Sequence, residues 1–573
     1  MKSGPRARRS QLLSTYGIGG LFPSETTSFM IVGLDEWKVE RATEVSEPRL
    51  ARSLRVRELK SPPAGTTRDI PVIRFPATQI CPTCRRIGSM KELARDWNIA
   101  KCAHCREKSD LTPFRLIAAC RRGHIGEFPY YRWLHKGQSA AGTTHEMKVK
   151  ALGRTSSLAD LVLECGCGVI PRSLDGATGP KALAEFGKCT GARPWLGPDY
   201  SQECAEIPKV LQRGASNVWF PAVRSAISIP PYSEALSKFV DKHWTALHDP
   251  AALNEKLLEN FAAASGRFTV EDIVGEIERR RGESDDADLD EEMLRRQEFQ
   301  ALLEGRRDGE AGSDFVCKKM ELDDGLPPLV TAVRKVTRLR EVRALFGFSR
   351  LEGVGATDTD TLCELSHTQR QWLPAIEVIG EGIFASFDRV MLDEWAGQSF
   401  ASTRRALLQR AANARARGYG RPEAPMVDIV RVALHTLAHV FIDQLSLDAG
   451  YPAASLRERL FVDTDFAGIL IYTASSDSAG SLGGVASQAE PARFAHALRE
   501  GLTRLSWCSA DPVCIEAKGS GVDALNLAAC HACVLVPETS CELSNTFLDR
   551  ALLFGTHEND QGAEGLFSGH YGW

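Results

Sequence analysis

The cysteines of this chain lie in pairs and clusters, and this arrangement constrains the fold more than any other feature. The first cluster, CPTCRRIGSMKELARDWNIAKCAHC, contains two Cys-x2-Cys pairs, Cys81 with Cys84 and Cys102 with Cys105. Each pair offers two thiolates from one turn, and four thiolates complete a closed tetrahedral zinc site. A closed site has no open coordination position, so the spacing predicts structural zinc. A redox role is disfavoured, because neither pair sits in a thioredoxin-like βαβ pattern.

A second cluster of cysteines is less regular. The segments LECGCG, GKCTG and SQEC contain Cys165, Cys167, Cys189 and Cys204. Four thiolates are again a ligand set for structural zinc, although a Cys-x-Cys pair and long connecting loops are less typical of a zinc knuckle. We expect these four residues to form a second zinc site, and buried structural thiols are the alternative.

The third cluster, WCSADPVCIEAKGSGVDALNLAACHACVLVPETSC, contains five cysteines, one more than a zinc site takes. Cys530 and Cys533 form a pair, and Cys541 is the expected third ligand. The fourth ligand is Cys514 or Cys508, and the spacing leaves both open. Together, the three clusters predict two to three structural zinc ions.

The surroundings expected for this chain are reducing. Its 573 residues include 16 cysteines, and clustered cysteines in a reducing compartment favour metal over disulfides. Arg8 and Arg9 stand near the start, but the stretch after them is short and interrupted by polar residues, which disfavours an export signal. No run of ~18 apolar residues occurs, so no membrane span is predicted. We expect a cytoplasmic protein.

The stretch AACRRGHIGEFPYYRWLHKG combines basic and aromatic side chains. The formal net charge of the chain is -4, so any contact with nucleic acid must use a local patch. Basic groups suit phosphates and aromatic rings suit stacked bases. The candidate DNA-binding residues are Arg121, Arg122, Tyr131, Arg132, Trp133 and Lys136. The alternative is ordinary amphipathic surface. Cys120 and His124 could bind metal only if a second pair of ligands, including His135, joined them.

No enzyme signature stands out in the sequence, and no nucleotide-binding P-loop occurs. HTLAH places His435 and His439 on one helix face, but the glutamate of a zincin is absent, so a buried core pair is favoured. The loop YTASSDSAGSLGGV is expected to be a structural turn; the alternative is phosphate contact through Ser476, Ser478, Gly483 and Gly484. We therefore expect no catalytic residues. The alternative is a metal-dependent nuclease that uses His435, His439 and Asp477.

The order of patterned segments predicts a mixed α+β, multidomain fold. We expect an N-terminal segment at 1–75, a β-rich zinc-binding region at 76–225, a helical charge-rich region at 226–325 and a C-terminal α/β domain with a four-cysteine zinc site at 326–573. Within the last, TAVRKVTRLREVRALFGFSR and AASLRERLFV are expected to be helices. PAIEVIGEGIFASF and AGILIYTA are expected to be strands.

Several longer segments resemble one known family. They are RRSQLLSTYGIGGLF, AACRRGHIGEFPYYRWLH, RGASNVWFPAVRSAISIP, LREVRALFGFSR, WLPAIEVIGEGIF, HTLAHVFIDQLSLDAGYPAASLRERLF, YTASSDSAGSLGG and AACHACVLVPETSCELSNTFLDRALL. Together they make the chain, from about residue 8 to 555, similar to the DrmB family of the bacterial DISARM anti-phage defence system. The last segment also resembles the C-terminal four-cysteine domain of certain DNA-repair helicases.

The resemblance implies a function that the residues alone do not. Proteins of this family pair with a separate superfamily 2 helicase, DrmA, and the complex engages incoming phage DNA. We therefore expect a non-catalytic subunit with a DrmA-like helicase as its partner and DNA as the ligand of the complex. Zinc clusters, a basic and aromatic stretch and the absence of a motor motif agree with this expectation.

Overall fold

The chain forms two compact units with the expected mixed α+β character. Unit 1 consists of residues 1–45, 50–225 and 343–376, and unit 2 of residues 46–49, 226–342 and 377–573. The four-part division expected from the sequence stays a prediction. The computed structural model describes residues 7–24, 27–66, 68–96, 99–136, 145–153, 157–251, 253–283, 289–306, 313–353, 361–418, 421–474, 483–556 and 565–570.

Unit 1 is built mainly from short antiparallel strands. Its largest sheet has the order β14-β13-β12-β6-β5-β9, formed by Arg172–Ser173, Leu161–Cys165, Met147–Ala151, Arg86–Ser89, Thr78–Ile80 and Thr112–Pro113. A second sheet is β1-β2-β4, formed by Leu21–Pro23, Ser28–Ile31 and Val72–Arg74. A third is β11-β10-β15, formed by Ile125–Glu127, Leu116–Ala119 and Lys209–Gln212. The hairpin β7–β8 is formed by Ala94–Asp96 and Ile99–Cys102.

The helices of unit 1 are equally short. They are α1 (Gln11–Ser14), α3 (Met90–Leu93) and α4 (Tyr130–His135), and α2 (Pro48–Ser53) ends in this unit. One hydrophobic cluster packs Phe128 and Trp133 against Leu116, Val149 and Leu163. Elements of two to six residues bury too little apolar surface to hold long loops in place by themselves. Unit 1 therefore needs other restraints, and its clustered cysteines and histidines lie at the ends of these elements or in the turns and loops between them.

Unit 2 contains most of a seven-stranded sheet. Its order is β16-β18-β19-β21-β20, and β17 pairs with β18 while β3 pairs with β19. The strands are β3 (Glu58–Lys60), β16 (Phe220–Ile227), β17 (Phe315–Met320), β18 (Val330–Ser349), β19 (Trp372–Phe387), β20 (Leu456–Val462) and β21 (Ala467–Thr473). The residues of β16, β18 and β19 are divided between the two units, and β3 belongs to unit 1.

Two segments expected to be helices are strands. The predicted basic helix TAVRKVTRLREVRALFGFSR forms most of β18, and AASLRERLFV contributes β20. Val333, Val336 and Leu339 of β18 are buried in the sheet. Arg334, Arg340 and Arg343 of this strand are also buried, and the guanidinium of Arg340 pairs with Glu377 (Nε to Oε2, 2.9 Å). A strand that is rich in β-branched residues and covered on both faces does not show a regular alternation of polar and apolar residues. Its pairing with neighbouring strands outweighs its local helix propensity. The strands expected at PAIEVIGEGIFASF and AGILIYTA are confirmed as parts of β19 and β21.

The helices of unit 2 fall into two groups. A charge-rich group comprises α5 (Ala235–Lys242), α6 (Trp244–Leu247), α7 (Glu255–Ser265), α8 (Val270–Glu283) and α9 (Glu291–Glu304), of which α9 contacts β20. The second group comprises α10 (Arg389–Ala396), α11 (Ser399–Gly418), α12 (Ile429–Ala449), α13 (Pro491–Leu505) and α14 (Ala551–Phe554).

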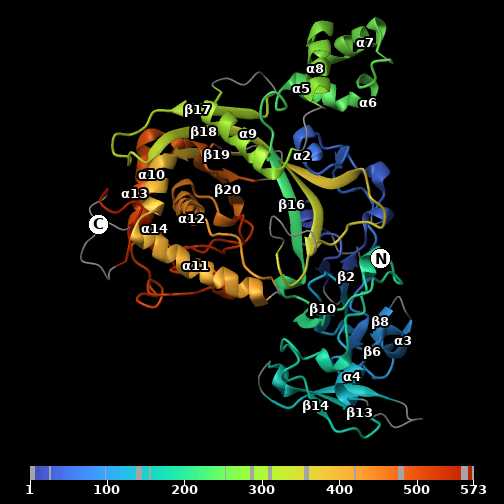
Figure 1. Ribbon diagram of the computed structural model, residues 1–573. Coiled ribbons are helices and arrows are strands. Elements are labelled where there is room, and N and C mark those ends of the chain that lie inside the picture. The colour runs from blue at the N-terminus through green and yellow to red at the C-terminus, as the bar shows by residue number, and fades with distance from the viewer. Residues whose placement is uncertain are drawn as a thin grey trace. The chain divides into compact units, whose positions relative to one another are not determined.

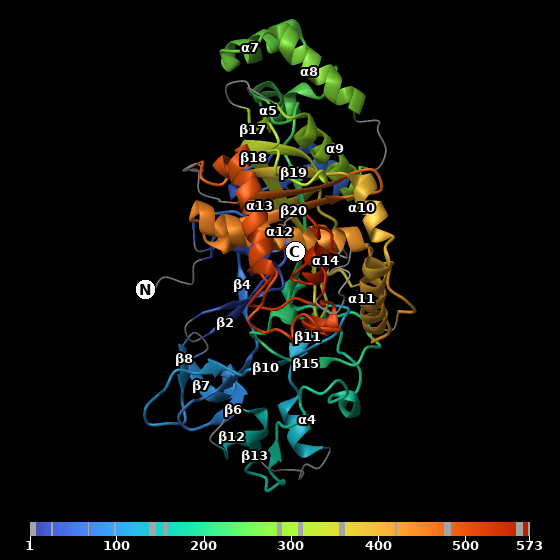
Figure 2. The same ribbon diagram turned by 90° about the vertical axis from the view of Figure 1, so that its left-hand side faces the viewer.

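The central element of unit 2 is α12. It contacts β20 and β21 on the sheet and also contacts α10, α11, α13 and α14 (Figure 1). Figure 2 shows α12 from the side, next to β20. Fifteen of its side chains are buried, including those of His435 and His439. The Asp428 carboxylate caps its first turn by accepting hydrogen bonds from the amides of Val430 and Arg431. In the part of the chain that the structure describes, no helix is both apolar and long enough for a membrane crossing.

Candidate metal centres

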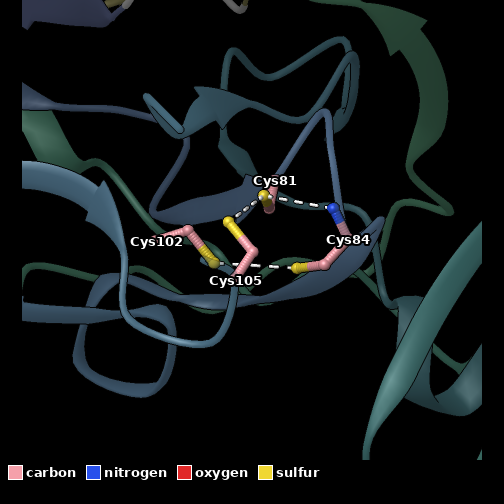
Figure 3. A group of neighbouring side chains, drawn as sticks. All are labelled: Cys81, Cys84, Cys102 and Cys105. Carbon is pink, nitrogen blue, oxygen red and sulfur yellow. Dashed lines mark hydrogen bonds between the residues drawn. The ribbon is translucent and has the colours of Figure 1, made fainter. Parts of the chain in front are cut away.

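The first metal candidate contains the four cysteines predicted to lie together. Cys81 and Cys84 lie in the turn between β5 and β6, while Cys102 ends β8 and Cys105 follows it, and the four side chains converge (Figure 3). The Sγ atoms of Cys81 and Cys105 are 3.9 Å apart, and those of Cys84 and Cys102 are 3.6 Å apart. A zinc–sulfur bond of about 2.3 Å implies an edge of roughly 3.8 Å in a tetrahedral site. The spacing therefore fits four ligands of one metal, and it is too wide for disulfides.

The surroundings of this first group favour thiolate ligands. The amide of Cys84 donates to Sγ of Cys81 and the amide of His104 donates to Sγ of Cys102, each across 3.4 Å. A backbone hydrogen bond from Ser109 lowers the pKa of Cys105 to about 7, whereas burial raises the pKa of Cys81 to about 12. Metal binding removes the protons that remain, because the ligand form of cysteine is the thiolate.

A second group combines Cys120, His124, Cys189 and Cys204. Cys120 follows β10 and His124 precedes β11, so one tight turn supplies two ligand atoms. Sγ of Cys120 lies 3.4 Å from Nδ1 of His124 and 4.0 Å from Sγ of Cys204. A hydrogen bond with Cys120 lowers the pKa of Cys189 to about 4, although burial opposes this shift. The residues form a Cys3His ligand set, which is one of the structural zinc types.

A third group combines His135, His145, Cys165 and Cys167. Nε2 of His135 lies 3.4 Å from Sγ of Cys167, and Nδ1 of His145 lies 3.5 Å from Sγ of Cys165. Nδ1 of His135 is 2.8 Å from the carbonyl oxygen of Tyr131, a contact that orients the ring and leaves Nε2 as the ligand atom. This is a Cys2His2 set.

These two groups correct one prediction. The sequence predicted that Cys165, Cys167, Cys189 and Cys204 form a single site, but the structure divides them between two groups. Cys165 ends strand β13 and Cys167 lies in the turn after it, whereas Cys189 and Cys204 lie in the loops before β15. The ligands that the sequence prediction left out are Cys120 and three histidines, and all of them precede Cys165 in the sequence. The Cys120–His124 pair and His135 were visible as candidates, but His145 carried no signal because it has no ligand neighbour in sequence.

The fourth group contains Cys508, Cys514, Cys530 and Cys533. The Sγ distances are 3.5 Å between Cys508 and Cys530, 3.8 Å between Cys514 and Cys533, and 3.6 Å between Cys530 and Cys533. Hydrogen bonding to Cys533, with the cationic Arg550 nearby, lowers the pKa of Cys514 to about 6. Both alternatives for the fourth ligand, Cys508 and Cys514, thus belong to the group.

Cys541 is not part of this fourth group, and its predicted place there is corrected. Its sulfur instead lies 3.1 Å from Nε2 of His435. His439 and Glu458 join the same cluster, so the described residues contain five groups with metal-ligand spacing. The interpretation of His435 and His439 as core residues agrees with their position, because both are fully buried.

The basic and aromatic stretch is only partly available to a ligand. The side chains of Arg122, Tyr131, Arg132 and Lys136 are exposed, and Arg121 is half-buried against Glu206 with 3.0 Å between Nε and Oε1. The prediction that Trp133 contacts DNA is corrected, because its side chain is 4% exposed and cannot stack on a base. Its indole packs in the core under the guanidinium of Arg172, and its Nε1 donates to the carbonyl of Ser173.

Part of the Ser- and Gly-rich loop lies outside the described residues. This part is residues 475–482, which include Ser476, Asp477 and Ser478, whereas Gly483 and Gly484 are described. A Cβ added to Gly484 would lie 2.9 Å from the Tyr451 ring. This close packing explains the glycine without a ligand.

The comparisons with known proteins cover both parts of the chain that contain metal candidates, and one of the matches names zinc binding. Residues 8–220, which include the first three groups, match a domain of unknown function (DUF8724), and residues 437–534, which include the fourth, match the MrfA Zn-binding domain. A protein of Bacillus paralicheniformis (strain ATCC 9945a / NCIMB 11709 / CD-2), described as "DISARM protein DrmB", is 31% identical over 554 residues. That alignment covers 93% of this chain and 97% of the relative. The chain therefore belongs to the DrmB family of DISARM proteins.

Proposed function

We propose that this chain is the non-catalytic partner of a DrmA-like superfamily 2 helicase, and that the two form a DNA-binding complex in DISARM defence against phages. The observation that carries the proposal is the match to DrmB along nearly the whole chain. It supports a role in anti-phage defence directly. The partnership with a helicase and the contact with DNA are more specific proposals, and they rest on the metal groups and on the exposed basic residues.

The metal groups are assigned a structural role in this proposal. The first four groups each bind one zinc ion with four protein ligands, so no position is left for a substrate or a water molecule. In unit 1 they join turns that the short strands cannot fix, because metal binding contributes directly to the free energy of folding. In unit 2 the four-cysteine group lies in the MrfA-type Zn-binding domain.

The DNA contact is assigned to Arg122, Arg132 and Lys136, with Tyr131 beside them. Arg122 lies in the turn between Cys120 and His124, while Arg132 and Lys136 lie on α4 and at its C-terminal end, next to His135. The scaffold of all three basic residues is thus held by the second and third metal groups. Exposed cations on a fixed scaffold suit backbone phosphates, which are recognised without sequence specificity.

Co-expression tests the partnership. The chain and a DrmA-like helicase are co-expressed and purified together over a tag on one subunit, and the affinity of each protein for duplex DNA is measured alone and mixed. The expected result is co-elution and a tighter complex with DNA than either protein forms. Separate elution combined with unchanged DNA affinity would rule the partnership out.

The nuclease alternative finds little support in the geometry. His435 and His439 are fully buried, and they face Cys541 and Glu458 rather than solvent. DNA cannot reach them without opening the core of unit 2. Labelled DNA incubated with the purified chain and Mg²⁺ or Mn²⁺ is expected to stay intact, and cleavage abolished by His439→Ala would restore the alternative.

A further inference from the structure

A fifth cluster of metal-ligand atoms lies in the core of unit 2. His435 and His439 come from α12, Glu458 from β20 and Cys541 from the segment that precedes α14, and we call them the core group. Both histidines are 0% exposed and Glu458 is 1% exposed. Cys541 is half-buried and packs against the main hydrophobic core.

The distances within the core group are within a few tenths of an ångström of those in a small coordination shell. Nε2 of His435 lies 3.1 Å from Sγ of Cys541 and 3.1 Å from Oε1 of Glu458, and Nε2 of His439 lies 3.6 Å from Oε2 of Glu458. All four ligand atoms lie within 4.8 Å of one another. Zinc bonds of about 2.0–2.3 Å to nitrogen, oxygen and sulfur imply edges of roughly 3.3–3.6 Å.

The hydrogen bonds around the histidines leave both Nε2 atoms facing the group. Nδ1 of His435 is 3.2 Å from the carbonyl oxygen of Phe547, and Nδ1 of His439 is 2.9 Å from that of Val534. A carbonyl only accepts, so each Nδ1 carries the proton. In the neutral ring each Nε2 then presents a lone pair to the group, which is the tautomer that metal-bound histidines use.

Backbone hydrogen bonds to the other two members of the core group favour their anionic forms. The amides of Leu543 and Asn545 donate to Sγ of Cys541 across 3.3 and 3.2 Å. The amide of Glu542 donates to Oε1 of Glu458 across 3.0 Å. The Nε2 lone pairs of the two histidines, the carboxylate of Glu458 and the thiolate of Cys541 therefore face one another. Nε2 of His439 and Oε2 of Glu458 are buried and have no hydrogen-bond partner among the described residues.

We propose that the core group binds a metal ion of the zinc type as a closed, four-coordinate His2GluCys site. A cation at its centre satisfies all four ligand atoms at once and removes the repulsion among them. The ligand set is complete and its histidines and glutamate are enclosed, so the ion has a structural role. The ion joins α12, β20 and the C-terminal segment, since each of them supplies a ligand. It brings together His435 and Cys541, which are separated by 106 positions in the sequence. The match to the MrfA Zn-binding domain, residues 437–534, includes His439 and Glu458 but neither His435 nor Cys541.

A metal-free core group is the rival explanation. It requires protons between the facing acceptors, on the imidazoles or on the Cys541 thiol, and the two rings have centroids 4.5 Å apart in the core. Burial opposes protonation, while Glu458 and Cys541 raise the pKa of His435 well above its ordinary value. The two explanations differ in metal content, because only the proposed site loses an ion when one of its ligands is removed.

Metal content of the full-length chain tests the proposal. Zinc per chain is measured by elemental analysis, with the protein quantified by amino-acid analysis, for the wild type, His439→Ala and Val440→Ala. Val440 is the neighbouring residue on α12 and is also buried, so its truncation controls for a loosened core. One zinc fewer in His439→Ala, with an unchanged content in Val440→Ala, is expected. Equal content in the wild type and His439→Ala overturns the proposal.

A second measurement separates loss of this ion from collapse of the neighbouring four-cysteine group. The chain is loaded with Co²⁺, and thiolate-to-cobalt charge-transfer absorption is compared for Cys541→Ser and Cys533→Ser. The core group has one thiolate and the fourth metal group has four, so Cys541→Ser is expected to lose one cobalt with a much smaller loss of absorption. A loss as large as that of Cys533→Ser would mean that Cys541 acts through the four-cysteine group, and the proposal would fall.

Discussion

The guanidinium of Arg350 donates a hydrogen bond to the carbonyl of Gly123, with 2.9 Å between Nε and O, and Gly123 lies in the turn between Cys120 and His124. Arg350 is fully buried, and its other two nitrogens donate to the carbonyls of Val218 (2.7 Å) and Gly19 (2.8 Å). One buried cation thus fixes the turn of the second metal group to two other segments of unit 1.

Replacing this cation is expected to loosen unit 1 and the second metal group together. Arg350→Met leaves three buried carbonyls without donors, which is expected to cost about 3 kcal/mol or more of unfolding free energy. The matched control is Arg121→Met, since the ion pair of Arg121 is half exposed and is worth about 1 kcal/mol or less. Urea unfolding and the rate of zinc release to a chelator provide the measurements. Equal effects of the two variants would show that Arg350 does not hold the turn.

Substitution of the glycine in this turn is a sharper test. Gly123 has a φ of +76°, and a Cβ at this position would lie 1.8 Å from Sγ of Cys363. Gly123→Ala is therefore expected to displace the turn and to lower the zinc content by one ion per chain, whereas Gly214→Ala, where a Cβ meets nothing within 4 Å, is expected to keep it. Unchanged zinc in Gly123→Ala would contradict the ligand assignment of Cys120 and His124.

Loss of one ligand from the first metal group is expected to remove one zinc ion and unfold the local turns. The variant is Cys84→Ser, and the control is Cys317→Ser, because Cys317 is a buried thiol that belongs to none of the five groups. Structural zinc binding is itself folding free energy, so protease sensitivity around residues 81–105 is expected to rise only in Cys84→Ser. An unchanged metal content in Cys84→Ser would contradict this.

The exposed basic residues of unit 1 are expected to set the salt dependence of DNA binding. Arg122→Ala and Arg132→Ala each remove one phosphate contact, which lowers the slope of log K against log salt by roughly 0.9 for duplex DNA. Arg410→Ala, at an exposed position on α11, serves as the control. The measurement is fluorescence anisotropy of labelled DNA at several salt concentrations, with the helicase complex. Slopes that match the wild type in both variants would show that this surface is a bystander.

A buried ion pair supports the sheet of unit 2. The guanidinium of Arg459 forms two 2.8 Å hydrogen bonds with the carboxylate of Glu298, and both residues are 1% exposed or less. Glu298→Ala leaves a buried charge without its main partner, and the expected loss is about 3–5 kcal/mol of unfolding free energy. Glu291→Ala, which removes an exposed pair on the same helix, is expected to cost less than about 0.5 kcal/mol. Denaturant titration compares them, and near-equal costs would show that the pair is not isolated from water.

The parts of the fold that were predicted correctly depend on neighbouring residues. Cys81, Cys84, Cys102 and Cys105 lie together as expected, because two tight turns each place two thiols on one side. The strand at β21 is continuously apolar and could be predicted from AGILIYTA alone. The helix that carries His435 and His439 has an N-cap, apolar residues on all sides and a glycine at its end.

The parts that were predicted wrongly depend on residues far apart in sequence. The segment of β18 was expected to be a helix, yet its place between β16 and β19 makes it a strand. Cys541 was assigned to the nearest cysteine pair, although its sulfur faces a histidine from α12. Sequence spacing ranks ligands by closeness along the chain, and long loops make that ranking unreliable.

The sequence by itself determined the four-cysteine set of the first metal group and the family, because both follow from residue types and local spacing. Only the tertiary structure decided how the ligands are grouped. Cys165 and Cys189 join different sites, and Cys541 joins His435 rather than Cys533. A metal site needs four atoms within a few ångströms, and which distant turns meet at that distance follows from the packing of strands and helices.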